Sequence, residues 1–510
     1  MAPGADGFGV PATVGQWIDA PARLGPHRPA IVAAERTVTY GELDAWADRL
    51  ARALLARGLA PGDRVATLTE NSVEHVVVLF ACARAGLILA PLNWHLSDDE
   101  LSTQLALFAP ALVLVSAARW DERVRGALAA AGPEPLEEFV AGASPPEGEP
   151  LAAPDGEAGL LLIATSGTTG TPKGALLTHR TCYWTNASLH AVMPIGPEDV
   201  VLSLLPQYHV GGWNIQTLLA WSQGATVVLE PAFDPGTVLE VIQRRRVTAM
   251  MGVPTMYVML AEHPDFERAD LSSLRAALVG GAAMPCATRE RWAQRGVAMA
   301  LGYGLTEAGP NTLILPPGQD AAHAGSVGEP YPYVEVALRD PLDGRLVEGA
   351  GRGEIVVRGP NLFAGYWRDP AATAAAVHDG WLRTGDIAER DADGYYRISG
   401  RTKEMFVSGG ENVFPVEIER VLSEHPAVAD VAVVSAPDAR WGEVGVAYVV
   451  PHRDVTVEPE ALVAFCREHL AHFKVPQRIV VTDELPRTPV GKIDKRFLAR
   501  RAEEGGGAPG

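Results

Sequence analysis

Short apolar strands alternate with helical segments through much of this sequence. Residues 40–57 place apolar side chains at helical spacing, and Gly58 then supplies a helix stop signal. Two apolar strands, 64–69 and 87–91, stand on either side of a second helix at 73–85. A strand–helix–strand unit of this kind implies parallel strands. The sequence therefore predicts an α/β fold built on a parallel sheet.

The same rhythm returns after residues 132–157, a Pro-, Gly- and Glu-rich stretch that predicts an irregular surface connection between two lobes. Further strands are expected at 160–164, 200–204, 226–229, 248–252 and 276–279. Beyond residue 400, short strands and two helices predict a small α+β domain. We therefore expect a large N-terminal domain of α/β lobes at 1–400, a small C-terminal domain at 401–500 and a disordered tail at 501–510.

Composition excludes several classes of protein. The 510 residues carry 62 Asp and Glu against 43 Lys and Arg, a formal charge of −19 that would repel nucleic acid. The apolar residues are dispersed rather than gathered into membrane-length runs, so we expect no transmembrane segment. Four widely spaced cysteines and the lack of a secretory signal favour a reducing, cytoplasmic location. Homodimers are common among soluble enzymes, and the sequence leaves the choice between a monomer and a homodimer open.

A loop of glycines and hydroxyl side chains follows the strand expected at 160–164. Its sequence, TSGTTGTPKG, spans 165–174 and contains a single lysine, Lys173. Glycines let backbone N–H groups approach anionic oxygens, hydroxyls donate further hydrogen bonds, and the lysine adds positive charge. The loop is therefore suited to holding phosphate. It is not a Walker loop, because Pro172 precedes the lysine and Gly174 follows it, and this disfavours a kinase or P-loop ATPase.

Further motifs accompany this loop in a set order along the chain. They are GYGLTE at 302–307, WLRTGD at 381–386, GRTKE at 400–404, SGGEN at 408–412 and PRTPVGKI at 486–493. Together with the loop they resemble the adenylate-forming superfamily of acyl-CoA synthetases, adenylation domains and luciferases, over nearly the whole chain. The resemblance implies the fold of that superfamily, in which the small C-terminal domain is a mobile lid.

The resemblance also implies a nucleotide site. The implied ATP- and AMP-binding residues are Thr165, Ser166, Gly167, Thr168, Thr169, Gly170, Lys173, Gly281, Ala282, Ala283, Gly302, Tyr303, Gly304, Thr306, Glu307, Asp386, Arg401, Asn412 and Lys492. Among them Tyr303 would stack on adenine, Thr306 would bind the α-phosphate and Asp386 would accept the ribose hydroxyls. Glu307, with Thr165, would hold Mg²⁺, because a carboxylate suits a hard cation that bridges phosphate oxygens.

A two-step reaction follows from the same resemblance. The acid attacks the α-phosphorus of ATP and displaces pyrophosphate, while Lys492 would bridge the oxygens on which negative charge builds. The acyl-adenylate then passes its acyl group to the thiol of coenzyme A, and Lys492 must leave to let the thiol in. Related enzymes rotate the small domain about a hinge that matches Lys403. This brings in the loop of Ser408, Gly409 and Gly410, whose glycines leave room for a pantetheine arm.

The segment LPQYHVGGWN at 205–214 resembles the family segment that leads into the acyl pocket. His209 is its candidate gate for the acid, and with Lys492, Thr306 and Glu307 it is a predicted catalytic residue, although a lone histidine is often structural. The predicted acyl pocket consists of His209, Gly211, Trp213, Asn214, Gly280 and Gly281. No aspartate stands between residues 207 and 229 to pair with a substrate amine, which favours a neutral fatty or aromatic acid over an amino acid.

We therefore predict an ATP-dependent, AMP-forming acyl-CoA ligase for a fatty or hydroxycinnamate-like acid, with ATP, Mg²⁺ and coenzyme A as cofactor and co-substrates. Two alternatives stay open at this point. One is an enzyme that loads a carrier-protein pantetheine or stops at the acyl-adenylate, and the other is a luciferase-like monooxygenase on the same fold. The chain departs from the family at Leu301, where many relatives have Gln, and at Ala164, which replaces a frequent Tyr. Neither change removes a charged group.

Overall fold

The computed structural model divides the chain into compact units. The described residues are 12–34, 36–144, 151–166, 172–319, 323, 325–341, 343–408, 411–453, 455–487 and 493–504. The first unit comprises Met1–Val336 and Val356–Arg383, and the second comprises Ala337–Ile355 and Thr384–Gly510. The division differs from the boundary expected at residue 400, because strands on both sides of that residue pack within the second unit. No helix among the described residues is long and apolar enough to cross a membrane.

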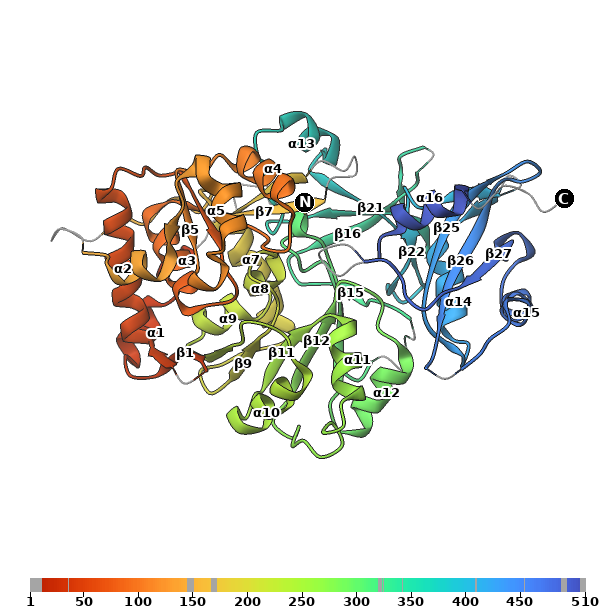
Figure 1. Cartoon of the computed structure of the whole chain (residues 1–510), viewed down its shortest axis with the longest axis horizontal. Coiled ribbons are helices and arrows are strands. Elements are labelled where there is room, and N and C mark those ends of the chain that lie inside the picture. The colour runs from red at the N-terminus through yellow and green to blue at the C-terminus, as the bar shows by residue number, and fades with distance from the viewer. Residues whose placement is uncertain are drawn as a thin grey trace. The chain divides into compact units, whose positions relative to one another are not determined.

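One sheet of the first unit is parallel through its centre. Its strand order is β15-β14-β13-β12-β11-β9-β10-β1-β2, and the run from β13 to β1 pairs in parallel. The strands are β1 (Pro29–Ala33), β2 (Arg36–Thr39), β9 (Val200–Ser203), β10 (Thr226–Leu229), β11 (Ala249–Gly252), β12 (Ala276–Gly280), β13 (Met299–Tyr303), β14 (Leu313–Leu315) and β15 (Glu329–Pro330). Helices α10 (Pro235–Arg245), α11 (Pro254–Glu262) and α12 (Cys286–Gln294) connect the parallel strands (Figure 1). The strands expected near 200, 226, 248 and 276 are therefore confirmed.

The other sheet of the first unit has the order β19-β8-β7-β4-β3-β5-β6. Its strands are β3 (Arg64–Leu68), β4 (Ile88–Pro91), β5 (Leu112–Val115), β6 (Glu134–Pro135), β7 (Gly159–Ser166), β8 (Pro172–Thr178) and β19 (Gly365–Tyr366). The order confirms the predicted parallel pairing of β3 with β4. The residues between β7 and β8, which include Gly167, Thr168, Thr169 and Gly170, lie outside the described residues.

Helices stand before and after β3, as the sequence predicts. α2 (Tyr40–Ala56) begins with a capping box, in which Thr39 accepts a hydrogen bond from the Glu42 backbone and the Glu42 side chain bonds back to Thr39. α3 (Val73–Ala85) ends at Gly86, which takes a left-handed φ of 70° that glycine adopts at little cost. The remaining helices of the first unit are α1 (Asp19–Leu24), α4 (Asp98–Phe108), α5 (Glu122–Leu128), α6 (Leu136–Ala141), α7 (His179–Val192), α8 (Val210–Asn214), α9 (Thr217–Ser222) and α13 (Pro370–Ala376).

The expected irregular connection at 132–157 is partly wrong. Strand β6 and helix α6 both fall inside it, and the helix buries Leu136 and Val140. The helix sequence LEEFVA is rich in leucine, glutamate and alanine, which form helices readily, so the short helix needs only these two apolar anchors. Residues 145–150 of the stretch lie outside the described residues.

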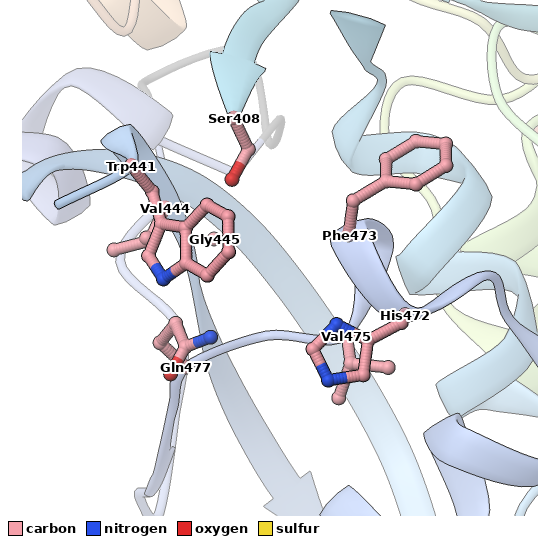
Figure 2. A pocket seen from close by; sticks show the side chains of 8 residues that line it. All are labelled: Ser408, Trp441, Val444, Gly445, His472, Phe473, Val475 and Gln477. Carbon is pink, nitrogen blue, oxygen red and sulfur yellow. The ribbon is translucent and has the colours of Figure 1, made fainter. Parts of the chain in front are cut away.

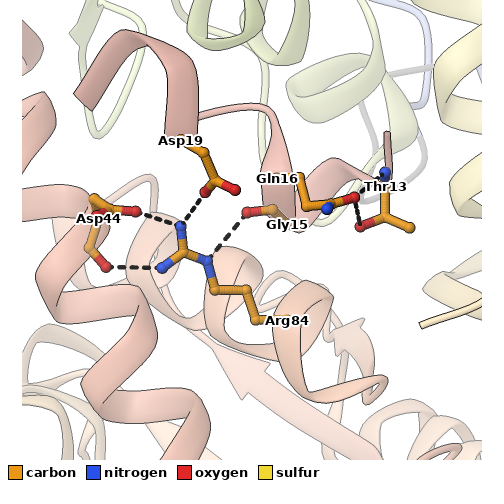
Figure 3. A network of polar contacts seen from close by, with 6 residues as sticks. All are labelled: Thr13, Gly15, Gln16, Asp19, Asp44 and Arg84. Carbon is orange, nitrogen blue, oxygen red and sulfur yellow. Dashed lines mark hydrogen bonds and ion pairs between the residues drawn. The ribbon is translucent and has the colours of Figure 1, made fainter. Parts of the chain in front are cut away.

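The N-terminal segment is held to the first unit by Arg84, which projects from α3. Figure 3 shows its guanidinium between Gly15, Asp19 and Asp44. Nε donates to the Gly15 carbonyl at 3.1 Å, and Nη1 donates to the Asp44 carbonyl at 2.9 Å. Nη2 pairs with the Asp19 carboxylate at 2.7 Å and also with that of Asp44. Burial raises the pKa of Asp19, although Arg84 acts in the opposite direction.

The second unit contains a mainly antiparallel sheet, with helices on both faces and one parallel pair, β26 with β27. Strand order is β24-β23-β26-β25, with β27 alongside β26. Its elements are β23 (Phe406–Ser408), β24 (Glu411–Val413), α14 (Pro415–Ser423), β25 (Val428–Asp438), β26 (Gly442–Pro451), α15 (Pro459–His469), β27 (Arg478–Val481) and α16 (Lys495–Glu504). α14 and α15 share one apolar cluster with the sheet, through residues such as Ile418 and Leu462, and α16 joins another through Leu498 and Ala502 (Figure 1).

The disordered tail expected to begin at residue 501 is wrong for its first residues. Helix α16 continues to Glu504, and Ala502 is fully buried. The helix is amphipathic. Although its composition is strongly polar, its two buried apolar residues suffice to pack it against the sheet. A further sheet, of six strands, has the order β17-β16-β18-β21-β20, with β22 beside β21. Its strands are β16 (Glu335–Arg339), β17 (Leu346–Val347), β18 (Gly351–Arg358), β20 (Val377–His378), β21 (Trp381–Arg390) and β22 (Tyr396–Arg401).

Candidate active site

Predicted site residues gather where parallel strands of the first sheet end. β12 ends at Gly280 and β13 at Tyr303, and the two strands are paired so that Gly280 lies opposite Gly302. A Cβ on Gly280 would come within 3.1 Å of the Met251 side chain and 3.2 Å of the Gly302 carbonyl, so the position has little room for a side chain. In open α/β sheets the carboxyl ends of the strands are the usual ligand edge. The exposed run Gly281, Ala282 and Ala283 continues from β12 at this edge and presents no bulky side chain there.

The turn after β13 carries Thr306 and Glu307 in a single 3₁₀ turn, Thr306–Ala308. A Cβ on Gly304 would lie 1.4 Å from the Pro310 carbonyl oxygen, so only glycine fits the entrance to this turn. The backbone N–H of Phe363 donates to the Glu307 carbonyl at 3.0 Å. The turn is therefore fixed by close backbone packing, and the side chains of Thr306 and Glu307 remain half-buried.

Two residues predicted to line the acyl pocket have hydrogen-bond partners inside the protein. The Asn214 side chain is fully buried, donates to the Gly309 carbonyl and accepts from Asn186 at 2.6 Å. The Trp213 indole is also fully buried and donates to the Gln207 carbonyl at 2.5 Å. Asn214 thus supports the turn that bears Glu307, and Trp213 supports the loop that bears His209. The sequence does not reveal this, because the spacing on a short helix does not fix which face turns inward.

His209 precedes α8 and is partly buried. Its ring lies 4.6 Å from that of Tyr208, which in turn makes edge contacts with the rings of Trp94 at 6.1 Å and His95 at 6.2 Å. The chain there is tightly folded, since a Cβ on Gly212 would come within 2.5 Å of the Pro206 carbonyl oxygen. The Tyr208 ring therefore lies against His209 and joins it to the rings of Trp94 and His95.

Asn71 secures the loop that bears His209. Its side-chain amide donates to the carbonyls of Leu205 at 3.0 Å and Glu230 at 3.1 Å, and its oxygen accepts from the Gln207 backbone at 2.9 Å. At Gly211 a Cβ would approach the Leu205 side chain to 3.1 Å, so this glycine is close to its neighbours rather than open to space. Sequence reasoning missed Asn71, because it lies far from the loop along the chain.

Lys173, Tyr366 and Glu307 form one polar group at the mouth of the phosphate loop. The Tyr366 hydroxyl donates to Oε1 of Glu307 at 2.8 Å, and Nζ of Lys173 lies over the Tyr366 ring, 4.7 Å from its centroid. Burial, followed by the charge of Glu307, raises the pKa of Tyr366, so the phenol stays a neutral hydrogen-bond donor. The sequence predicted Lys173 and Glu307 but gave no signal for Tyr366, which reaches them from strand β19.

The phosphate loop is the connection of a β-hairpin. In the register of β7 with β8, Thr165 lies opposite Lys173, and the Thr165 hydroxyl donates to the Lys173 carbonyl at 3.4 Å. Ser166 closes the hairpin opposite Pro172. Both ends of the loop are therefore fixed by strand pairing, while its central residues, Gly167 to Gly170, fall outside the described part of the chain.

The chemistry of these residues fits a nucleotide with a bound magnesium ion. Among the described residues, no group of three or more His, Cys, Asp or Glu side chains could hold a metal by itself. Mg²⁺ characteristically takes one or two carboxylates and completes its shell with substrate phosphates and water. Glu307 is a half-buried carboxylate, and the Lys173 ammonium lies on the face of the tyrosine that bonds it, so the two residues fit such a group.

In the second unit, Asp386 and Arg401 form an ion pair across β21 and β22, whose register places them opposite each other. Oδ1 of Asp386 lies 2.8 Å from Nε of Arg401, and the side chains are 7% and 61% exposed. The arginine therefore holds a buried carboxylate in place. Lys403 is exposed in the turn that follows β22, and Asn412 belongs to β24.

Ser408 ends β23 and lines a small cavity of about 30 Å³ in the second unit. Figure 2 shows its hydroxyl above the ring of Trp441, with His472, Phe473 and Gln477 around the same space. Gly409 and Gly410, predicted for the same tunnel, lie outside the described residues. The sequence did not predict the aromatic lining, which comes from segments far from Ser408 along the chain.

Lys492 also lies outside the described residues, but the chain on both sides of it is anchored. Arg487 bridges to Ile493, and its guanidinium pairs with Asp430 at 2.7 Å. A few residues later, Nζ of Lys495 reaches Glu404 at 2.8 Å and Glu419 at 2.9 Å. Burial opposes the charge of Lys495, yet these carboxylates outweigh it and raise the pKa of the lysine.

Comparison with known proteins gives the class. The AMP-binding enzyme family matches residues 18–367, and the AMP-binding enzyme C-terminal domain matches residues 417–492. A feruloyl-CoA synthase from an Amycolatopsis species is 41% identical over 96% of this chain and 99% of its own length. A long-chain-fatty-acid–CoA ligase from Mycobacterium tuberculosis is 34% identical over 95% of this chain and 97% of its own.

Solved structures agree with the sequence relatives. The o-succinylbenzoate coenzyme A synthetase from Bacillus subtilis, in complex with ATP and magnesium ion, superposes with a TM-score of 0.84 at 32% identity, over 95% of this chain and 99% of that chain. The chain therefore belongs to the AMP-binding, adenylate-forming enzyme family. Within it, the protein is an ATP-dependent, AMP-forming acyl-CoA ligase.

Proposed function

We propose that this ligase activates an aromatic acid of the hydroxycinnamate kind in preference to a long-chain fatty acid. The observation that carries the proposal is the row of rings beside His209, in which Tyr208 contacts the ring of His209 and also the rings of Trp94 and His95. Flat rings make edge and stacking contacts with an aryl substrate that an alkyl chain cannot reproduce. The higher identity to the feruloyl-CoA synthase, 41% against 34% for the fatty-acid ligase, supports the same choice.

In the first step the acid carboxylate attacks the α-phosphorus of ATP, a new P–O bond forms, and the bond to pyrophosphate breaks. Lys173 and the 165–170 loop would hold the β- and γ-phosphates, and Thr306 would bind the α-phosphate. Glu307, with Thr165, would hold Mg²⁺, which when bound neutralises phosphate charge. Tyr303, beside Gly302 and Gly304, would stack on adenine, with Gly281, Ala282 and Ala283 along the base.

Asp386 suits the ribose hydroxyls, because a carboxylate held by Arg401 at 2.8 Å keeps its other oxygen in a set direction. Asn412 would support the same nucleotide. Lys492 would bridge the carboxylate and the α-phosphate as charge builds during the attack. His209 would orient the incoming acid, with Gly211 and Gly280 as small neighbours along its path.

In the second step the sulfur of coenzyme A attacks the acyl carbonyl, a C–S bond forms, and AMP leaves with the bonding electrons of the anhydride. The thiol proton passes to a base or to solvent. Ser408, Gly409 and Gly410 would border the path of the pantetheine arm, and the cavity at Ser408 lies beside this segment. Lys403 would be the hinge, a role that its exposed turn suits because backbone angles can change there at low cost.

The acid preference is tested by comparing kcat/KM for pyrophosphate release with ferulic, indoleacetic, benzoic and palmitic acids. We expect the aryl acids to exceed palmitate by about tenfold or more, because the discrimination rests on ring contacts rather than a single methylene. Replacing Tyr208 with Leu should narrow that ratio. A wild-type preference for palmitate would overturn the proposal. Formation of acyl-CoA with free coenzyme A, rather than acyl transfer only to a carrier protein, checks the acceptor in the same assay.

The role of Lys492 is tested by separating the half-reactions. Lys492→Ala should lower pyrophosphate release by about 10²–10³-fold or more. It should leave thioester formation from supplied acyl-adenylate largely intact, because the lysine is not needed in that step. An equal loss in both half-reactions would contradict the assignment. A bulky replacement at Gly410 provides the reverse control, since it should spare pyrophosphate release and stop transfer to coenzyme A.

A further inference from the structure

We propose that Tyr366 is a positioning residue that keeps the phosphate-binding lysine and the metal-binding carboxylate apart and aimed at the nucleotide. The inference rests on the proposed roles of Lys173 and Glu307. It adds a third residue, from a strand that carries none of the motifs predicted from the sequence. Tyr366 would not react with substrate, and it would act only through the two charged groups that it contacts.

Strand pairing places the Tyr366 ring beside Lys173. In the register of β19 with β8, Tyr366 lies opposite Ala175. Lys173 is two residues from Ala175 along β8, so its side chain projects from the same face of the sheet as that of Tyr366. This diagonal arrangement accounts for the ammonium lying 4.7 Å from the ring centroid, within the range of a cation–π contact.

The backbone around the ring is fixed on both sides. Trp367 donates to the Gly174 carbonyl at 2.7 Å, and the Tyr366 N–H donates to the Thr373 hydroxyl at 2.8 Å. Phe363 packs edge-on against the Tyr366 ring at 5.0 Å, and its own N–H bonds the Glu307 carbonyl at 3.0 Å. One short segment, 363–367, therefore ties the phosphate hairpin to the turn that bears Glu307.

The hydroxyl end of the ring orients the carboxylate. It donates to Oε1 of Glu307 at 2.8 Å, which leaves Oε2 as the oxygen available to a cation. Within the described part of the chain, no ion pair joins Lys173 to Glu307. The Lys173 ammonium lies on the face of the Tyr366 ring, and the Glu307 carboxylate accepts from the hydroxyl at the end of that ring. Without the ring and hydroxyl of Tyr366, the two opposite charges would be left to pair and neutralise each other before the nucleotide arrives.

The experiment measures nucleotide affinity by titration calorimetry without any acid present, so no turnover occurs. ATP is titrated with and without Mg²⁺ into the full chain, and the ratio of the two affinities is the magnesium gain. Tyr366→Phe keeps the ring but removes the hydroxyl, so we expect the gain to fall about tenfold, as for a hydrogen bond to a charged group. The affinity for ATP without Mg²⁺ should change by less than about twofold, because the cation–π contact remains.

Tyr366→Leu removes the ring as well. It should lower the magnesium gain equally and also weaken ATP binding without Mg²⁺ by about two- to fivefold, the value of an exposed cation–π contact. Tyr40→Phe is the matched control, since it removes a buried hydroxyl that bonds the Ala225 carbonyl at 2.6 Å elsewhere in the same unit. Tyr40→Phe should lower thermal stability and leave the magnesium gain unchanged.

Glu307→Gln separates this inference from the proposed function. If Glu307→Gln abolishes the magnesium gain while Tyr366→Phe keeps the wild-type value, Tyr366 is not a positioning residue and the metal assignment stands. If Glu307→Gln itself keeps the gain, the metal assignment fails and the inference fails with it. Loss of the gain in both variants, with the Tyr40→Phe value unchanged, supports the inference.

Discussion

Two charged clusters of the first unit differ in their partners: one pairs opposite charges with each other, and the other places both charges against a neutral tyrosine. The Arg84 cluster consists of Arg84, Asp19, Asp44 and Gly15, and all three guanidinium nitrogens have protein acceptors within it. The Lys173 cluster consists of Lys173, Tyr366 and Glu307. Among the described residues, its ammonium faces an aromatic ring and its carboxylate accepts a hydrogen bond from a hydroxyl. Both clusters are partly buried, so exposure does not explain the difference.

The contrast follows from what each cluster must bind. A half-buried ion that lacks an opposite charge is costly, so a chain keeps one only where another molecule completes the site. Arg84 joins the N-terminal segment, α2 and α3. Its guanidinium pairs with carboxylates of the protein itself, so no charge is left for a ligand. In the proposed function, Lys173 and Glu307 keep their charges for phosphate and a cation. We therefore expect changes in the Lys173 cluster to affect catalysis and changes in the Arg84 cluster to affect stability.

The largest expected effect is loss of adenylation in Lys173→Met. The side chain keeps similar length but loses its charge, and kcat/KM for pyrophosphate release should fall by about 10²–10³-fold, as when one preorganised contact to developing charge is removed. The urea midpoint of unfolding should stay at the wild-type value, because Lys173 has no carboxylate partner among the described residues. A large fall in stability would place Lys173 with the structural cluster and break the comparison.

Arg84→Met should have the reverse signature. Removal of the guanidinium leaves Asp19, Asp44 and the Gly15 carbonyl without their donor, at a cost of about 2 kcal/mol in the free energy of unfolding. This figure is kept low because Asp19 and Asp44 are 53% and 38% exposed and water replaces part of the lost contact. Urea unfolding gives the stability, and kcat/KM measured well below the transition should be unchanged. Reduced activity with unchanged stability would contradict the division.

The same N-terminal segment has a pH-sensitive contact at His179. The Val14 N–H donates to Nδ1 of His179 at 3.2 Å, and burial lowers the pKa of this histidine to about 4. The fold therefore favours the neutral ring, and the unfolded chain takes up a proton first as pH falls below about 6.5. The stabilisation that the neutral His179 ring gives the fold is fully present above that pH and is lost as pH falls toward about 4.

We expect the free energy of unfolding to drop by about 1 kcal/mol through His179 between pH 6.5 and 5.5. His179→Gln should remove this part of the pH dependence, and urea titrations of both proteins at several pH values measure it. Parallel pH profiles for wild type and variant would show that His179 does not titrate in this window.

Local signals in the sequence predicted most elements and failed for contacts between distant segments. The apolar runs near residues 64, 200 and 276 became strands, because burial on both faces leaves a continuous apolar pattern. Strand β19 is only a residue pair, Gly365–Tyr366, and forms because β8 offers an edge far away in sequence. No local pattern marks such a pair.

The candidate site shows the same limit. Lys173 and Glu307 were found through motifs, and the structure brings them together through Tyr366, which has no motif of its own. The side chains of Trp213 and Asn214 are fully buried and bond the Gln207 and Gly309 carbonyls, partners that the motif did not reveal. A motif fixes which residues occur together, whereas the direction of a side chain depends on the helix rotation that the surrounding packing selects.

The smallest expected effect concerns Thr39, which caps the helix that carries Asp44. The Thr39 side chain accepts from the Glu42 N–H at 3.3 Å, and the Glu42 carboxylate accepts from the Thr39 N–H at 2.8 Å. Thr39→Ala should cost about 0.5 kcal/mol, the low end for a lost cap, because this capping box is exposed to solvent. We combine Thr39→Ala with Arg84→Met in a double variant. If the capped end of α2 helps to place Asp44, the loss in free energy of unfolding of the double variant should be smaller than the sum of the two single losses. Simple additivity in urea unfolding would show that the Arg84 cluster is held by α3 alone.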